Sequence, residues 1–202
     1  DHSQIKGMEN IGSEFLNQPF DPGNQYSVPY FWGTLGIVYN EKLISKAPEH
    51  WDDLWKPEYK NSIMLIDGAR EVMGIGLNSL GYGLNDKNAN HLQEAVDKLY
   101  KLTPNIKAIV ADEMKGYMIQ NNAAIGVTFS GEARQMLEKN ENLRYVVPSE
   151  ASNLWFDNIV IPKTVKNKKA AYQFINFMLR PENAYKNALY VGYATPIPKA
   201  KA

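Results

Sequence analysis

The chain has 202 residues, enough for one large domain or two small ones, and its hydrophobic fraction of 44% and charged fraction of 22% are ordinary for a globular protein. Its formal net charge is +0, so charge predicts binding neither to nucleic acid nor to a membrane surface. Cysteine is absent, which excludes disulfides, thiolate catalysis and cysteine-ligated metals, and no apolar run approaches the ~20 residues that span a bilayer.

The first part of the chain predicts short elements joined by turns. They are a helical segment at 14–16, an extended edge segment at 26–30, a buried strand at 33–39, a short helix at 41–44 and a helical turn at 51–55. The segment at 26–30 is placed at an edge because Pro29 cannot donate to a strand ladder.

From residue 62 onward, predicted strands and helices alternate. The strands are expected at 62–66, 106–110, 124–129, 143–147 and 155–161, and the helices at 70–80, 88–102, 113–121, 132–139, 168–179 and 182–191. The helix at 88–102 has the clearest pattern, since Leu92, Val96 and Leu99 recur at helical spacing. The alternation predicts an α/β sheet covered by helices, in which ligands bind beyond the carboxyl ends of strands.

Acidic and aromatic side chains gather at the ends or edges of three predicted strands. These clusters contain Asp67 and Glu71, then Phe129 and Glu132, and finally Trp155 and Asp157. Carboxylates beside aromatic faces suit an organic ammonium, because the acids pair with its charge while the rings contact its methylenes and attract the cation. The alternative interpretation is that the acids are helix N-caps and that Trp155 is a core residue.

Two other chemistries would use the same acids. Asp67 and Glu71 form a candidate acid/base pair of a hydrolase, although nothing in the sequence supplies a carboxylate for the opposite face of a sugar. A hard-cation site formed by Asp67, Glu71 and Asp157 is disfavoured by the neighbouring Phe129 and Trp155, because aromatic side chains do not ligate Ca²⁺ or Mg²⁺. The histidines are isolated, and no P-loop or nucleophile elbow is present. We therefore expect no catalytic residue, no metal and no cofactor.

Several motifs resemble the substrate-binding proteins of polyamine ABC transporters, the spermidine/putrescine-binding family. The stretches that carry the resemblance are PFDP at 19–22, YSVPYFWG at 26–33, WDDLWKPEYK at 51–60, DGAREV at 67–72, LWFD at 154–157 and INFMLRP at 175–181. They follow the family's order over nearly the whole chain. The combination of DGARE with WFD is the most specific part.

The resemblance implies a two-lobed, Venus-flytrap fold of the type II periplasmic-binding-protein class. It implies that residues 33–156 form the second lobe and that residues 1–32 and 157–202 belong to the first lobe. The chain is then expected to be a fragment, truncated at the N-terminus and near the C-terminus. An incomplete first lobe would expose sheet edge and apolar surface, so we also expect self-association of this form.

The function implied by the resemblance is capture of spermidine or putrescine outside the cytoplasm and delivery to the permease subunits of an ABC importer. The protein would be periplasmic, or lipid-anchored at the cell surface, and a signal segment is absent from this sequence. The choice of polyamine is left open, as is a solute-binding protein for another cation or for a sugar.

The resemblance also implies individual ligand contacts. Glu71 and Asp157 would each hold an amine, and Trp155 would pack on the polyamine chain. Phe129 stands where the family often has a tryptophan, which keeps a ring at this position. We also expect Trp32 to contact the ligand.

One departure from the family pattern concerns an amine contact. Gly68 stands where the family often has a second acid. We expect Asp67 or Glu132 to compensate for that missing carboxylate.

Overall fold

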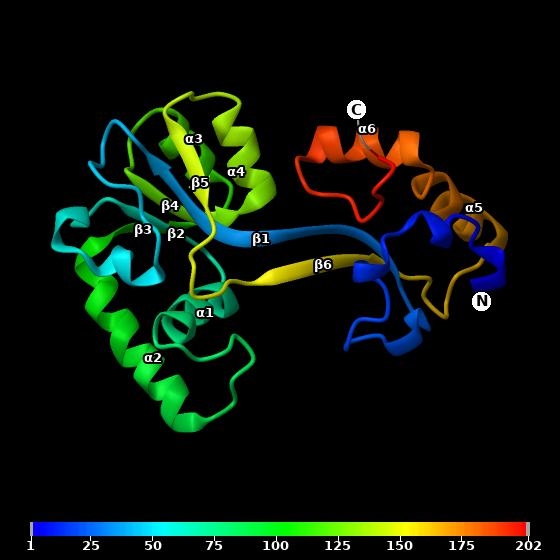
Figure 1. Ribbon diagram of the computed structural model, residues 1–202, viewed down its shortest axis with the longest axis horizontal. Coiled ribbons are helices and arrows are strands. Elements are labelled where there is room, and N and C mark those ends of the chain that lie inside the picture. The colour runs from blue at the N-terminus through cyan, green and yellow to red at the C-terminus, as the bar shows by residue number, and fades with distance from the viewer. Residues whose placement is uncertain (1, 201–202) are drawn as a thin grey trace. The chain divides into compact units, whose positions relative to one another are not determined.

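The structure is a computed structural model that describes residues 2–200. Asp1 and residues 201–202, at the ends of the predicted ranges 1–32 and 157–202, lie outside the described residues. The chain divides into two compact units (Figure 1). The central unit is Thr34–Leu154, and the terminal unit combines Asp1–Gly33 with Trp155–Ala202.

The central unit is a mixed sheet with helices on both faces (Figure 1). Its strands are the second part of β1 (Val28–Asn40), β2 (Ile63–Ile66), β3 (Ile106–Val110), β4 (Ile125–Phe129) and β5 (Leu143–Val146). Its α-helices are α1 (Ala69–Ser79), α2 (Ala89–Leu102), α3 (Glu113–Ile119) and α4 (Ser130–Leu137). Three short 3-10 helices complete it, η5 (Trp51–Trp55), η6 (Pro57–Tyr59) and η7 (Thr103–Asn105).

The strand order of this sheet is β3-β2-β4-β1-β5. Strand β2 runs parallel to both β3 and β4, whereas β1 is antiparallel to β4 and β5. The carboxyl ends of β2, β3 and β4 therefore lie at one edge of the sheet. The predicted α/β architecture with helices covering a sheet is confirmed.

Alternating side chains divide the central core into two layers. Leu35 and Ile37 of β1 belong to the layer covered by η5, α1 and α2, and Val38 belongs to the layer covered by α3 and α4. Four buried methionines line this second layer, namely Met64, Met114, Met118 and Met136. Each fully buried aliphatic side chain contributes about 1.5–3 kcal/mol, so the two layers fix which helices cover which face.

The terminal unit has its own apolar core. Its elements are the first part of β1, β6 (Leu154–Ile159), α5 (Lys168–Met178), α6 (Pro181–Val191) and the 3-10 helices η1 (His2–Gln4), η2 (Met8–Asn10), η3 (Ser13–Phe15) and η4 (Pro22–Asn24). Strand β6 pairs with β1. The core side chains are Ile11, Val28, Ile175, Leu179, Ala184 and Ile197. No helix within residues 2–200 combines the length and the apolar character that crossing a membrane requires.

Two predicted elements are wrong. The segments at 26–30 and 33–39 form one continuous strand, β1, which tolerates Pro29 because proline is its second residue. The helix predicted at 41–44 is a single turn, in which the backbone N–H groups of Leu43 and Ile44 both donate to the carbonyl of Asn40. The Asn40 side chain accepts the N–H of Lys42, a local bond that competes with helix formation.

Candidate ligand-binding site

The carboxyl ends of two neighbouring parallel strands bring two of the predicted clusters together. Leu65 of β2 is in register with Val127 of β4. Asp67 and Phe129 each follow two residues later, so they lie at the same edge of the sheet. A helix starts within two residues of each of them, α1 at Ala69 and α4 at Ser130.

Asp67 and Glu71 present carboxylates at this edge. Asp67 is exposed, and its backbone N–H donates to the carbonyl of Val110 over 2.9 Å. Helix α1 has Gly68 at its N-cap without a side-chain hydrogen bond, so the alternative that Asp67 caps this helix is wrong. Glu71 is half-buried in the first turn, where the helix dipole favours negative charge. Neither carboxylate forms an ion pair or a hydrogen bond within residues 2–200.

The second cluster differs because its acid has a cation nearby. Glu132, in the first turn of α4, forms an ion pair with Lys115 of α3. Lys115 also donates to the side-chain oxygen of Gln135 over 3.1 Å. Phe129 is half-buried and packs against the first core layer. The charge of Glu132 is thus already balanced, whereas those of Asp67 and Glu71 are not.

The third cluster lies on β6, within the terminal unit. Because side chains alternate along a strand, Trp155 and Asp157 share one face of β6 and Phe156 lies on the other. Phe156 contacts Phe15 and Phe20, with ring centroids 6.3 and 6.0 Å apart. Trp155 is half-buried rather than enclosed in the core. A ring and a carboxylate therefore lie two residues apart on the same face.

The electrostatics of Asp157 set it apart from acids with structural roles. Partial loss of hydration raises the pKa of Asp157 above its usual range. Asp157 is exposed, and it has no ion pair or hydrogen bond from any other described side chain. A cation bound beside this carboxylate would supply the charge that it lacks.

Trp32 is held mainly by its own unit. Its backbone N–H donates to the carbonyl of Ala194 over 3.0 Å, and its indole N–H donates to that of Thr195 over 3.3 Å. The ring packs at a tilt against Phe15, with centroids 5.4 Å apart. These contacts fix the orientation of the indole.

The structure adds an aromatic side chain that the sequence interpretation missed. Tyr193 meets Trp155 edge-on, with ring centroids 4.8 Å apart and an interplanar angle of 81°. Gly192 ends α6 with φ of 91°, and Tyr193 follows it directly. The sequence signal that could have indicated Tyr193 is an aromatic residue directly after the glycine that ends a helix.

Metal-binding geometry is not found in the described chain. Within residues 2–200, no group of three His, Asp or Glu side chains could hold a metal ion.

The full sequence matches a family model, that of the bacterial extracellular solute-binding proteins, over residues 1–202. The chain belongs to this family. Membership places it outside the cytoplasm, and the expected resemblance and type of fold are confirmed.

Curated relatives include the spermidine/putrescine-binding periplasmic proteins of Salmonella typhimurium and Escherichia coli. They are 40% and 38% identical to this chain over 197 residues, which is 97% of the chain and 57% of each relative. The chain thus spans a little over half the length of these relatives. Their names describe solute-binding proteins of the periplasm.

Solved structures show the same fold. A spermidine/putrescine ABC transporter substrate-binding protein, PotD from Streptococcus pneumoniae, in complex with calcium and HEPES, is 80% identical, with a TM-score of 0.90 over 98% of this chain and 61% of its own. A putative spermidine/putrescine ABC transporter protein from Listeria monocytogenes is 59% identical, with a TM-score of 0.93 over 99% of this chain and 62% of its own.

Proposed function

We propose that the protein is the solute-binding component of an ABC importer and that its ligand is a polyamine, spermidine or putrescine. The observation that carries the proposal is a set of carboxylates near aromatic rings that have no cationic partner within residues 2–200, namely Asp67, Glu71 and Asp157. The names of the relatives at 40% and 80% identity support the same ligand class. The permease subunits of the importer would be the protein partner, and nucleic acid would not be one.

Separate carboxylates would hold the separate ammonium groups of the ligand. Glu71 and Asp67 would hold one ammonium group, with Phe129 as the nearby ring. Asp157 would hold another, and Trp155 would pack along the methylene chain. We also propose that residues 33–156 correspond to one lobe and residues 1–32 and 157–202 to parts of the other.

The remaining predicted residues have less direct roles in this proposal. The carboxylate of Glu132 is paired with Lys115. It would therefore contribute to the electrostatic potential of the site and would not hold an amine by itself. Trp32 and Tyr193 would support the aromatic wall, since each is held by contacts within the terminal unit.

Charge-assisted hydrogen bonds determine the expected selectivity. Each is worth about 1.5–3 kcal/mol, and a ring facing the cation adds about 0.5–2 kcal/mol. A diamine can pair with two separate carboxylates, whereas a monoamine can pair with only one. We therefore expect diamines and longer polyamines to bind far more tightly than alkyl monoamines.

Calorimetry on the full-length gene product tests the proposal. Putrescine, cadaverine, spermidine and spermine are titrated in turn, with butylamine as the monoamine control and a panel of glycosides as candidate hydrolase substrates. Saturable binding of at least one polyamine, unchanged by EDTA, is expected. Absence of heat with every polyamine would overturn the proposed ligand class, and hydrolysis of a glycoside would favour the acid/base role of Asp67 and Glu71.

A further inference from the structure

Gly68 lies between the end of β2 and the first turn of α1. Its backbone has φ of −156° and ψ of 108°, which is extended and open to any residue. A Cβ atom at this position would nevertheless lie 3.2 Å from the carboxyl carbon of Glu71 and would overlap one of its oxygens. The Glu71 carboxylate therefore occupies the space that any side chain at position 68 would need.

The direction of the Glu71 side chain follows from its position in the helix. Helical side chains lean toward the N-terminus, and a glutamate in the first turn reaches back toward the N-cap residue. In a capping box it would accept the N-cap N–H. Here the Gly68 N–H donates instead to the carbonyl of Ile66 over 2.9 Å. The carboxylate thus lies over Gly68 with its acceptor capacity unused.

We propose that Gly68 is a positioning residue, whose missing side chain lets the Glu71 carboxylate lie back at the strand end next to Asp67. This inference rests on the proposed function. A terminal primary ammonium group has three N–H donors and needs several acceptors close together. The Glu71 carboxylate over Gly68, together with the exposed carboxylate of Asp67 at the same strand end, would provide them. Gly68 would therefore favour ligands that end in a primary amine.

The substitution Gly68→Ala separates this role from a structural one. The extended backbone accepts alanine without strain, and only the end of a flexible side chain has to move. We expect a nearly unchanged Tm, because the lower entropy of the unfolded alanine chain offsets the poorer fit of alanine at the N-cap of α1. Polyamine affinity of the full-length gene product should fall roughly tenfold, since one charge-assisted contact is weakened.

Gly83→Ala is the matched control. Nothing lies within 4 Å of a Cβ at Gly83, and its φ is outside the left-handed region. This variant should keep the wild-type affinity. An equal loss of affinity in both variants would overturn the positioning role.

A double-mutant cycle tests whether Gly68 acts through Glu71. In a Glu71→Ala background, Gly68→Ala should cause no further loss, and an undiminished loss there would overturn the inference. If Glu71→Ala binds polyamine too weakly to measure, the ¹³C chemical shift of the Glu71 carboxyl carbon tests the role of Gly68 instead. This chemical shift should change in Gly68→Ala and remain as in wild type in Gly83→Ala. An unchanged chemical shift in Gly68→Ala contradicts the proposal.

The same experiments distinguish the two levels of the proposal. A wild-type protein that binds no polyamine overturns the proposed function and this inference with it. If wild type and Gly68→Ala bind polyamine with the same affinity, the proposed function is supported and only the positioning role of Gly68 is overturned.

Discussion

Acids in this protein fall into two groups according to their partners. Burial alone would raise the pKa of Asp53, but hydrogen bonds from Lys56 and from the backbone N–H groups of Glu49 and His50 outweigh it and lower the pKa to about 2. The hydroxyl of Ser27 and nearby backbone N–H groups likewise lower the pKa of Asp21. Asp157 has no such donors among residues 2–200, and partial burial raises its pKa. The fold does not stabilise the ionised form of Asp157. A cationic ligand would stabilise it, so this acid is suited to binding one.

Asp157→Asn should weaken polyamine binding by about 1.5–3 kcal/mol, because it removes a charge-assisted contact. The raised pKa adds a pH dependence. Binding requires the ionised carboxylate, so affinity is full above the pKa of Asp157 and is lost as the pH falls through it. That loss should begin at a higher pH than for an ordinary aspartate, whose pKa is about 3.9. Calorimetry at several pH values measures both effects.

The control for this prediction is Glu141→Gln, which alters an exposed acid that lies outside the clusters. Unchanged affinity in Asp157→Asn, or an equal loss in Glu141→Gln, would show that Asp157 does not contact the ligand.

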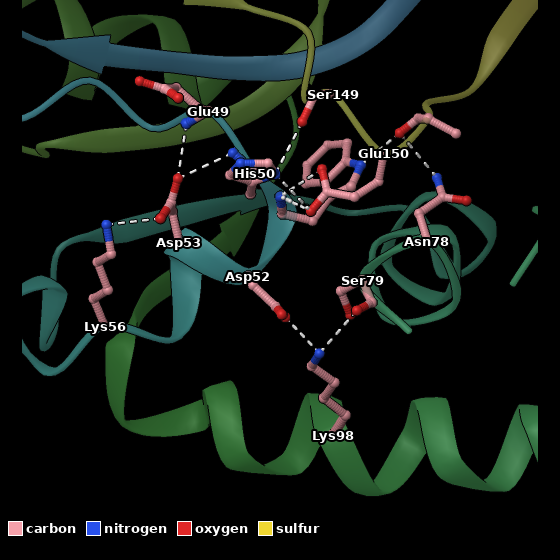
Figure 2. Close-up of polar contacts among 12 residues, drawn as sticks. Glu49, His50, Asp52, Asp53, Lys56, Asn78, Ser79, Lys98, Ser149 and Glu150 are labelled. Carbon is pink, nitrogen blue, oxygen red and sulfur yellow. Dashed lines mark hydrogen bonds and ion pairs between the residues drawn. The ribbon is translucent and has the colours of Figure 1, made fainter. Parts of the chain in front are cut away.

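At the scale of single elements, the tryptophan-rich segment 51–55 is a structural anchor. Figure 2 shows η5 fixed from several sides. The backbone N–H of Trp51 donates to the Glu150 carboxylate, and its indole N–H donates to the Ala151 carbonyl over 2.7 Å. Lys98 of α2 donates to Asp52 over 2.5 Å and to the Ser79 carbonyl over 3.1 Å. These contacts join η5 to α1, α2 and the chain that leads into β6.

Asp53→Asn should lower stability by about 1 kcal/mol, the usual size of a lost helix-capping contact. The pKa of Asp53 is lowered from 3.8 to about 2 on folding. Its ionised form therefore stabilises the fold fully above about pH 4, and this contribution is lost as the pH falls toward 2. Urea unfolding should show a clearly smaller difference between wild type and variant at about pH 2 than at about pH 7, because Asp53 is partly protonated in the folded state at pH 2. An equal difference at both values would contradict the assignment.

Sequence periodicity predicts the elements that are stabilised by local contacts, and it misses features that depend on distant residues. Helix α2 follows from the spacing of its leucines alone. The turn after β1 depends on Asn40, whose side chain also donates to Asn121 over 2.6 Å. That bond joins residues far apart in the chain, so no local pattern reveals it.

The candidate site shows the same division. The acids and rings at strand ends were recognisable from sequence, because β2 and β4 were predicted to end there. The Lys115 partner of Glu132, the contact of Tyr193 with Trp155 and the position of Glu71 over Gly68 were not. Each depends on how separate elements pack or on a side-chain direction.

At the scale of the whole molecule, the two units differ in how completely they bury apolar side chains. The central unit encloses two core layers around its sheet. Both units leave aromatic side chains in solvent, such as Tyr100 in the central unit. Exposed large side chains are more numerous for its size in the terminal unit, where Tyr26 is 80% and Tyr190 is 89% exposed. It also contains a cavity of about 250 Å³ whose lining includes Ile5, Val28 and Ile159. Exposed apolar surface of this kind favours association.

Residues 1–202 should therefore self-associate through the terminal unit and, because they span only 57% of the length of the curated relatives, bind spermidine more weakly than those relatives. Each 1.4 kcal/mol of lost contact reduces affinity tenfold, so the loss of a few ligand contacts is enough to make binding hard to detect. Light scattering and calorimetry on one sample measure both properties. Tyr26→Asp and Tyr190→Asp should reduce association, whereas Tyr100→Asp, at a 74% exposed tyrosine of the central unit, should not. A monomeric chain with micromolar spermidine affinity would show that residues 1–202 already contain the contacts that binding requires.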